Sequence, residues 1–501
     1  MAAQGPESGE RHTVSIGFAA ARLPPLPPSF DSLKKPPLAF NPFSAPRVSS
    51  LVEPHLPGLS GRAYRCRCGK PVFFTNSRCL ACNTALGYDP HQAQLLPLMP
   101  AEEPGTWLAW DHTRASDPSK PLPASAVPAP SYRRCSNLST PAACNWLVPT
   151  ADPYGQNGLC SACRMNRTIP SLRDPQNPDN GFLWGRLERA KRRLVSALMA
   201  LGLPVGSRLA EDPEHGLMFD FLRSPRLGLH VSTGHHTGLI TLNLDEANDA
   251  TREALRETLR EPYRTLLGHF RHEVGHYYWG RLVCGTGWME GFRRLFGDET
   301  ADYAGSLRRH YQHGPPAGWQ LHFVSAYASM HPWEDWAECW AHYLHIRDTT
   351  DTALSFGLRG DHVNLEFTPF TMDALYEPDH PQAERFLAFL NDWTRLTTML
   401  NELSRAMGQP DFYPFVLPRE GVAKLHFIHL LVTSASRLPR PGYPLYKMPD
   451  DAVQSASPTP AQALSAALDE QPQGQARDCA AAIGTPDNAR QAPERLAPSN
   501  I

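Results

Sequence analysis

The segment His272-Glu273-Val274-Gly275-His276 places two imidazoles four positions apart with a carboxylate between them. Residues four apart on a helix share one face, so both histidines can bind a single zinc ion through their ring nitrogens. Glu273 would then lie beside the metal, where it can take a proton from zinc-bound water and pass it to a leaving amine. The pattern predicts hydrolysis by water whose pKa zinc lowers to about 7.

A motif of five residues can arise by chance on an amphipathic helix, where the two histidines would only line a polar face. The surrounding sequence favours a zinc site over a polar helix face. A β-rich run precedes the motif, a strong helical pattern contains it, and a second helical segment with acidic residues follows. We therefore expect a catalytic zinc rather than a solvated pair of histidines.

A catalytic zinc site has three protein ligands and leaves the fourth position to water. Glu334 and Glu338 lie one helical turn apart in the downstream segment. One carboxylate could bind zinc while the other accepts a hydrogen bond from a ligand imidazole. Either carboxylate could thus be the third ligand, with His331 and His342 as further alternatives.

Other features close to the motif have simpler interpretations. His269 lies one turn before His272, and we expect a core or supporting role for it rather than zinc ligation. His235 and His236 fall in a predicted turn, where solvated side chains are expected. The run GLITLNL at 238–244 alternates apolar and polar residues, which is typical of an edge strand that pairs with a peptide or of an ordinary core strand.

Eight of the 11 cysteines lie between residues 66 and 163 in two sets of four. Clustered CxxC pairs indicate metal binding rather than a disulfide framework. In the first set, four thiolates on two tight turns can make a closed tetrahedral zinc site, with a redox pair or an iron site as the alternative. The second set is more loosely spaced, and we expect a second structural zinc there or else free buried thiols. The two sets are Cys66, Cys68, Cys79, Cys82 and Cys135, Cys144, Cys160, Cys163.

The charge and hydropathy of the chain limit the kinds of partner that it can bind. Arginines near the cysteines could contact nucleic acid, but scattered basic residues are more often a solvated face, and no RNA-binding aromatic signature accompanies them. The net charge is −2, so the whole chain offers no attraction to polyanions. No apolar run is long enough to cross a membrane, and the N-terminus lacks a signal-peptide pattern. We expect a cytoplasmic protein with a peptide or protein substrate and without nucleic-acid or membrane partners.

The elements that must position the candidate residues follow from sequence periodicity. Two β-rich runs joined by GHHTG predict a hairpin. Apolar periodicity and helix-start signals predict five helices. They comprise one that ends near Gly202, one from residue 263 to about 283 with Pro262 at its first turn, one that begins at Pro332, and two over 381–408 and 419–435.

The combination of HExxH with a downstream ExxAE helix resembles the gluzincin class of metallopeptidases, and YASMHPWEDWAECW is similar to its lethal-factor-like branch. That resemblance implies Glu334 as zinc ligand, Tyr327 as the residue that stabilises the oxyanion, and Glu338 as support for a ligand imidazole. Over residues 64–360 the chain also resembles a bacterial family of zinc-binding metallopeptidases with an N-terminal segment like a zinc ribbon.

The expected fold is mainly α with a small β element (α+β), a zincin-like metallopeptidase domain preceded by cysteine-rich modules like zinc ribbons. Zn²⁺ is the expected cofactor, with one catalytic and one or two structural ions. Two rival functions are a non-catalytic zinc-ribbon protein that binds or regulates a partner and a zinc amidase that acts on a non-peptide substrate. The expected divisions are 1–60, Pro-rich and disordered; 61–95, zinc-ribbon-like; 96–131, loop or linker; 132–170, second cysteine-rich segment; 180–436, catalytic domain; and 440–501, disordered tail.

Overall fold

The computed structural model of the chain describes residues 61–110, 130–224, 231, 233–259, 261 and 263–436. The expectations for residues 1–60 and 440–501 lie outside this part of the chain. Among the described residues, no helix is both long and apolar enough to cross a membrane.

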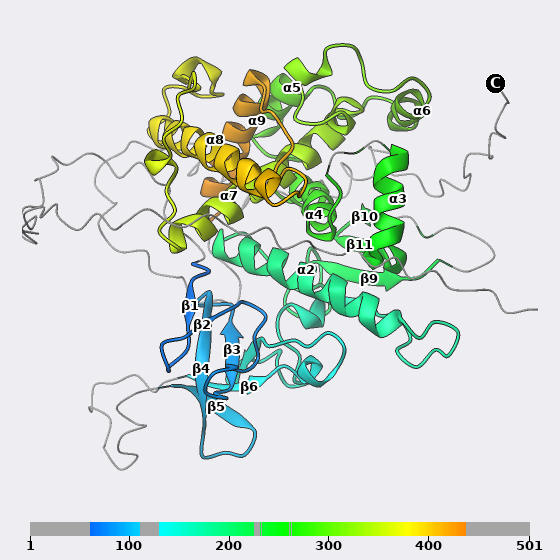
Figure 1. Cartoon of the computed structure of the whole chain (residues 1–501). Coiled ribbons are helices and arrows are strands. Elements are labelled where there is room, and N and C mark those ends of the chain that lie inside the picture. The colour runs from blue at the N-terminus through cyan, green and yellow to red at the C-terminus, as the bar shows by residue number, and fades with distance from the viewer. Residues whose placement is uncertain are drawn as a thin grey trace, which may run out of the picture. The chain divides into compact units, whose positions relative to one another are not determined.

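Short antiparallel strands make up the cysteine-rich part of the chain (Figure 1). A two-stranded sheet precedes a five-stranded sheet of order β3-β4-β5-β6-β7, in which all neighbours are antiparallel. The strands are β1 (Tyr64–Arg65), β2 (Pro71–Val72), β3 (Leu86–Asp89), β4 (Gln94–Pro100), β5 (Thr106–Ala109), β6 (Ser131–Arg134) and β7 (Leu147–Pro149). Because β3 follows the first cysteine set and β6 precedes the second, one sheet joins both.

This sheet differs from the expected linker over 96–131. β5 and most of β4 lie inside that range, where Leu98 and Thr106 are buried. The proline-rich sequence of the range concealed these strands, since Pro97 and Pro100 lie within β4. Residues 111–129 of the range lie outside the described residues.

A four-stranded sheet belongs to the helical domain and has the order β10-β11-β9-β8. β11 pairs parallel with β9 and antiparallel with β10, so GLITLNL forms an interior strand and the short β10 is the edge. A hairpin forms at GHHTG, but its first strand β10 lies within GHHTG itself, where the turn was predicted, and pairs with β11. The four strands are β8 (Asn166–Thr168), β9 (Met218–Leu222), β10 (Gly234–His236) and β11 (Leu239–Asn243).

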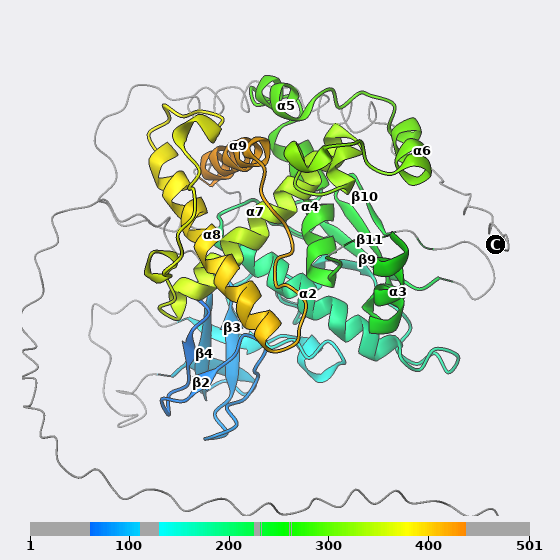
Figure 2. The same ribbon diagram turned by 45° about the horizontal axis from the view of Figure 1, so that its top comes forward.

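Eight helices complete the described part of the domain, and α4, α7 and α2 pack side by side in its centre (Figure 2). The mainly helical fold class with a small sheet and cysteine-rich β modules is confirmed. The helices are α2 (Asn180–Ala200), α3 (Asp249–Leu259), α4 (Leu266–Leu282), α5 (Met289–Phe296), α6 (Tyr303–His313), α7 (Pro332–Ser355), α8 (Ala383–Ala406) and α9 (Arg419–Ala435).

Local capping determines where the two central helices begin. The Thr265 hydroxyl accepts a hydrogen bond from the Gly268 amide at 3.0 Å, so α4 begins at Leu266 rather than at the expected residue 263. α7 begins at Pro332 as predicted, because the fixed φ of proline suits the first helical turn. The Nδ1 atom of His331 caps it by accepting from the Trp333 amide at 3.1 Å.

A glycine allows α4 and α7 to approach closely. A Cβ atom on Gly275 would lie 2.9 Å from the Cα of Ala337, so any larger residue would push the helices apart. The Trp336 indole also donates to the Gly275 carbonyl at 2.8 Å. This contact fixes the acidic face of α7 against the histidine face of α4.

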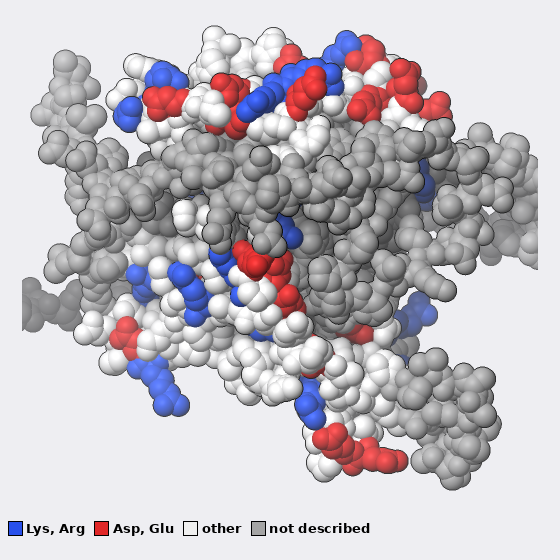
Figure 3. Space-filling view, turned by 180° about the vertical axis from the view of Figure 1, so that it is seen from behind, with Lys and Arg blue, Asp and Glu red and all other residues white. Residues whose placement is uncertain are grey.

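The surface carries charges of both signs. Figure 3, which views the side opposite to Figure 1, shows Lys and Arg side chains interspersed with Asp and Glu along the upper part of that face. Ion pairs of this kind include Arg293 with Glu299 and Arg405 with Asp411. Mixed charge at the surface agrees with the near-neutral total of −2.

Candidate catalytic metal centre

Two packed helices bring together the residues that the HExxH and ExxAE patterns predict. His272 and His276 lie one turn apart on α4, and Glu334 and Glu338 lie one turn apart on α7. Ligand atoms of His272, His276 and Glu334 all lie within 4.8 Å of one another. Among the described residues, this is the one group of histidines and carboxylates with such spacing.

The spacing of the three ligand atoms fits a tetrahedral zinc site. His272 Nε2 lies 3.2 Å from His276 Nε2 and 3.0 Å from Glu334 Oε2, and His276 Nε2 lies 3.6 Å from the same oxygen. Zinc bonds of about 2.0–2.1 Å in a tetrahedron separate ligand atoms by about 3.3 Å. The observed distances lie on both sides of that value, so the donor set fits Zn²⁺.

Hydrogen bonding gives a second reason to expect a cation. His272 Nδ1 lies 2.7 Å from Glu338 Oε1, which makes this nitrogen the donor and leaves a lone pair on Nε2. That lone pair faces Glu334 Oε2, a buried oxygen with no hydrogen bond. Two acceptor atoms held 3.0 Å apart repel each other unless a proton or a metal ion lies between them, and Glu334 and Glu338 accordingly raise the pKa of His272 against the effect of burial.

Glu338 is held in place from both sides. Its second oxygen accepts a hydrogen bond from the Ser325 hydroxyl at 2.6 Å. Burial disfavours the charged form of Glu338, but the hydrogen bond and charge of His272 outweigh burial and lower its pKa. The carboxylate is therefore ionised and orients the His272 ring.

Two tyrosines lie near Glu334. Tyr327, in a 3-10 turn before α7, places its ring 5.9 Å from that of His272. Tyr303, at the start of α6, donates its hydroxyl to Glu334 Oε1 at 2.8 Å. Burial and the nearby Glu334 raise the pKa of both hydroxyls, so both remain protonated donors. The sequence predicts Tyr327 at the site but gives no signal for Tyr303, 31 residues before Glu334.

Glu273 lies on α4 beside the ligand histidines and is 5% exposed. The His269 ring spans the distance between two carboxylates, with Nε2 at 3.6 Å from Glu273 and Nδ1 at 2.7 Å from Glu246. Burial lowers the pKa of His269, but Glu246 more than compensates and raises it. His269 therefore supports Glu273, in line with the expected supporting role, whereas no motif in the sequence pointed to Glu246.

The other candidate histidines have different partners. His342 Nδ1 lies 2.5 Å from the Tyr413 hydroxyl, and His331 caps α7 and contacts the Ala301 carbonyl at 3.1 Å. Neither belongs to the group of converging ligand atoms. His235 lies in strand β10 rather than in a turn, where it accepts from the Gly238 amide at 2.9 Å, and His236 is exposed as expected.

Each cysteine set gathers four sulfurs. Pairs of sulfurs lie 3.6 Å apart (Cys66 to Cys82), 3.8 Å apart (Cys68 to Cys79) and 3.7 Å apart (Cys144 to Cys160). Four Zn–S bonds of about 2.3 Å in a tetrahedron separate sulfurs by about 3.8 Å, whereas a disulfide needs about 2.05 Å. Both clusters therefore fit structural zinc.

The second cluster has a buried counter-charge. Burial disfavours the charge on Arg192 of α2, but Cys144, Glu188 and Cys163 together raise its pKa. Its guanidinium also donates to the Ala142 carbonyl at 2.8 Å. A four-thiolate zinc complex carries negative charge, so a buried arginine beside it suits the metal-bound state.

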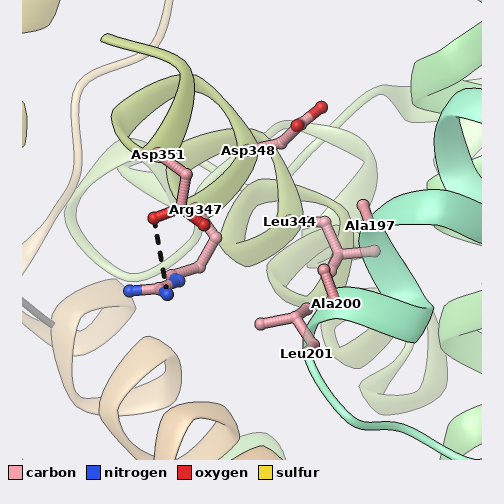
Figure 4. A pocket seen from close by; sticks show the side chains of 7 residues that line it. All are labelled: Ala197, Ala200, Leu201, Leu344, Arg347, Asp348 and Asp351. Carbon is pink, nitrogen blue, oxygen red and sulfur yellow. Dashed lines mark ion pairs between the residues drawn. The ribbon is translucent and has the colours of Figure 1, made fainter. Parts of the chain in front are cut away.

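A small cavity between α2 and α7 lies apart from these sites (Figure 4). Figure 4 shows the Arg347 and Asp351 ion pair on one side and the apolar side chains of Leu201 and Leu344 on the other. Its volume of about 10 Å³ admits at most one water molecule, so it cannot hold a substrate.

The fold and the site together define a class of protein, namely a mainly helical domain with a two-histidine, one-glutamate group suited to a metal ion, preceded by a cysteine-rich β module. The family described as "Putative zinc-binding metallo-peptidase" matches residues 180–431, and the chain belongs to this family. A zinc-ribbon domain family matches residues 63–174, a range that includes both cysteine clusters.

The chain is similar to mycobacterial proteins that are described as uncharacterized. Uncharacterized proteins of Mycobacterium tuberculosis (strain H37Rv) and Mycobacterium bovis are each 41% identical to the chain over 373 residues. That alignment covers 74% of this chain and 95% of each relative. No solved structure gives a significant match to the chain.

Proposed function

We propose that the chain is a zinc-dependent peptidase of the gluzincin type, in which His272, His276 and Glu334 bind the catalytic zinc. The observation that carries the proposal is the convergence of these three ligand atoms beside Glu273, with Glu338 orienting His272. When bound, zinc acidifies water and polarises the carbonyl that is to be cleaved. The remaining steps fall to side chains of the chain itself.

Glu273 acts as the general base and then as the general acid. Its carboxylate takes a proton from the attacking water and delivers it to the nitrogen of the leaving amine. His269, 3.6 Å from Glu273, holds the carboxylate toward the site. The Tyr327 hydroxyl stays protonated and its ring lies 5.9 Å from that of His272, so it can stabilise the negative charge that develops on the carbonyl oxygen.

Strand β10 supports a peptide as the substrate. Its residues pair on one side with β11, and no described strand pairs with its other side. His235 of β10 lies with its ring 6.3 Å from that of His276, so the edge runs close to the metal ligands. An extended peptide that pairs with this edge would bring its backbone to the zinc.

The Glu273→Gln variant tests the proposal against a library of peptides. Loss of the base should reduce cleavage by about 10²- to 10⁴-fold while zinc content stays at the wild-type level. Glu257→Gln, which neutralises an exposed glutamate of α3, is the matched control and should cleave normally.

Two rival functions make different predictions in the same experiment. If neither the wild type nor Glu273→Gln cuts any peptide or protein in a broad screen, a binding or regulatory role gains support. If non-peptide amides are hydrolysed in a Glu273-dependent manner while peptides are not, the chain is a zinc amidase. Equal peptide cleavage by both forms would rule out the proposed mechanism.

A further inference from the structure

The two oxygens of Glu334 have separate environments. Oε2 faces the Nε2 atoms of His272 and His276 at 3.0 and 3.6 Å, whereas Oε1 accepts the Tyr303 hydroxyl at 2.8 Å. A carboxylate can bind zinc through one oxygen or through both. A hydrogen bond to Oε1 favours the first mode, because it satisfies the oxygen that the metal does not need.

We propose that Tyr303 is a positioning residue that keeps Glu334 as a one-oxygen ligand of the catalytic zinc. The proposal rests on the zinc site put forward above and deepens it. A hydrolytic zinc needs an open coordination position for water. A second bond from Glu334 would occupy that position, so a donor that holds Oε1 protects it.

Contacts within the protein fix the position of Tyr303. Asp302 caps α6 by accepting from the Gly305 amide at 2.9 Å, which sets the first turn that carries Tyr303. The Tyr303 ring packs 5.2 Å from that of His331 and 6.3 Å from that of Trp333. These aromatic contacts restrict the conformation of the side chain, so its hydroxyl is directed toward Glu334.

Tyr303 and Tyr327 thus have different roles near the carboxylate of Glu334. Tyr303 contacts the ligand directly at 2.8 Å, whereas no hydrogen bond joins Tyr327 to Glu334. Tyr327 instead lies with its ring 5.9 Å from that of His272, where its hydroxyl can reach a substrate. Loss of the Tyr303 hydroxyl should therefore weaken zinc binding, whereas loss of the Tyr327 hydroxyl should slow turnover only.

The zinc affinity of the full-length chain, measured by competition with a chromophoric chelator, tests this assignment without any substrate. Tyr303→Phe keeps the ring and removes the hydroxyl, and it should weaken the catalytic zinc by about 10- to 100-fold. Tyr327→Phe should retain wild-type zinc affinity. Tyr154→Phe, at a position in the cysteine-rich region that is 42% exposed, is the control and should change neither zinc affinity nor cleavage.

Wild-type zinc affinity in Tyr303→Phe would overturn the proposal, as would an equal loss in Tyr327→Phe. A second measurement does not depend on the variant folding. In the zinc-loaded wild type, a crystal structure should show Glu334 bound through Oε2 alone with the Tyr303 hydroxyl on Oε1, and bidentate binding would overturn the proposal. Because neither readout needs cleavage, a chain that binds zinc and cuts nothing would contradict the peptidase but not the role of Tyr303.

Discussion

His272 donates from Nδ1 to Glu338 Oε1 at 2.7 Å, across the contact between α4 and α7. The imidazole therefore has its proton on the nitrogen away from the metal site. Glu334 lies one turn before Glu338 on α7. This helix therefore contributes both a candidate zinc ligand and the carboxylate that orients His272. Close packing at Gly275 makes this arrangement possible.

Glu338→Ala should weaken binding of the catalytic zinc by about 10- to 100-fold, because His272 would lose the partner that fixes its ring and tautomer. Chelator competition measures the change. Glu338→Gln keeps an oxygen that can accept from Nδ1 and should lose less affinity. Equal affinity in the wild type and Glu338→Ala would show that His272 needs no such partner.

Elemental analysis should find three zinc ions per chain, one for each group of converging ligands. His272→Ala should retain two, because the two cysteine clusters share no residue with the histidine site. Treatment with a mild chelator should remove the catalytic ion first, since closed four-thiolate sites release zinc reluctantly. Two ions in the wild type with His272 intact would mean that one cysteine cluster binds none.

The titration of His269 should depend on Glu246. Glu246 raises the pKa of His269 above 6.5, and His269 in turn helps to lower the pKa of Glu246 to about 2 against the effect of burial. The contribution of His269 to stability is complete below pH 6.5 and is lost as pH rises through its folded-state pKa. The contribution of Glu246 is present above pH 4.5 and is lost as pH falls toward 2. The pair of His269 and Glu246 therefore stabilises the fold most between about pH 4.5 and pH 6.5.

In histidine-selective NMR spectra, the His269 resonance should titrate with a midpoint above 6.5 in the wild type and below 6.5 in Glu246→Gln, where burial acts alone. The spectrum of His269→Asn identifies the resonance. A midpoint that does not move in Glu246→Gln would mean that the 2.7 Å contact does not persist in solution.

The sequence predicts those parts of the site that depend on helical spacing. HExxH and ExxAE each fix two side chains on one face, since residues four apart must share a face on a helix. The long helices α8 and α9 were predicted within a few residues for the same reason. Proline at the first turn correctly indicated the start of α7.

Contacts between segments that lie far apart in the chain have no sequence pattern comparable to helical spacing. Tyr303 reaches Glu334 from a helix of 11 residues, and Glu246 reaches His269 from a 3-10 turn, without a motif that links either pair. The edge position of β10 was missed because three residues are too few to show alternation. Strand order depends on pairing partners, so GLITLNL looked the same whether it formed the edge or the interior of the sheet.

Asp348 joins four segments through buried charge. It accepts from Arg62 at 3.3 Å, from Arg193 at 2.8 Å and from Arg271 at 2.7 Å, and thereby links the start of the cysteine-rich region to α2, α4 and α7. Burial opposes its ionisation, but Arg193, Arg271 and Arg62 hold its pKa well below the usual range. Arg271 directly precedes the zinc ligand His272, so this cluster also anchors the metal helix.

Asp348→Asn should therefore lower the free energy of unfolding by about 3–5 kcal/mol in urea at pH 7, because arginines that are only 3% exposed would lose their counter-charge. As pH falls below about 3.9, protons bind the unfolded but not the folded Asp348, so the wild type should lose stability faster than the variant. Asp361→Asn, in the exposed pair with Arg359, is the control and should cost less than about 1 kcal/mol. Equal losses in the two variants would mean that the cysteine-rich region is not fastened to the metal helix through Asp348.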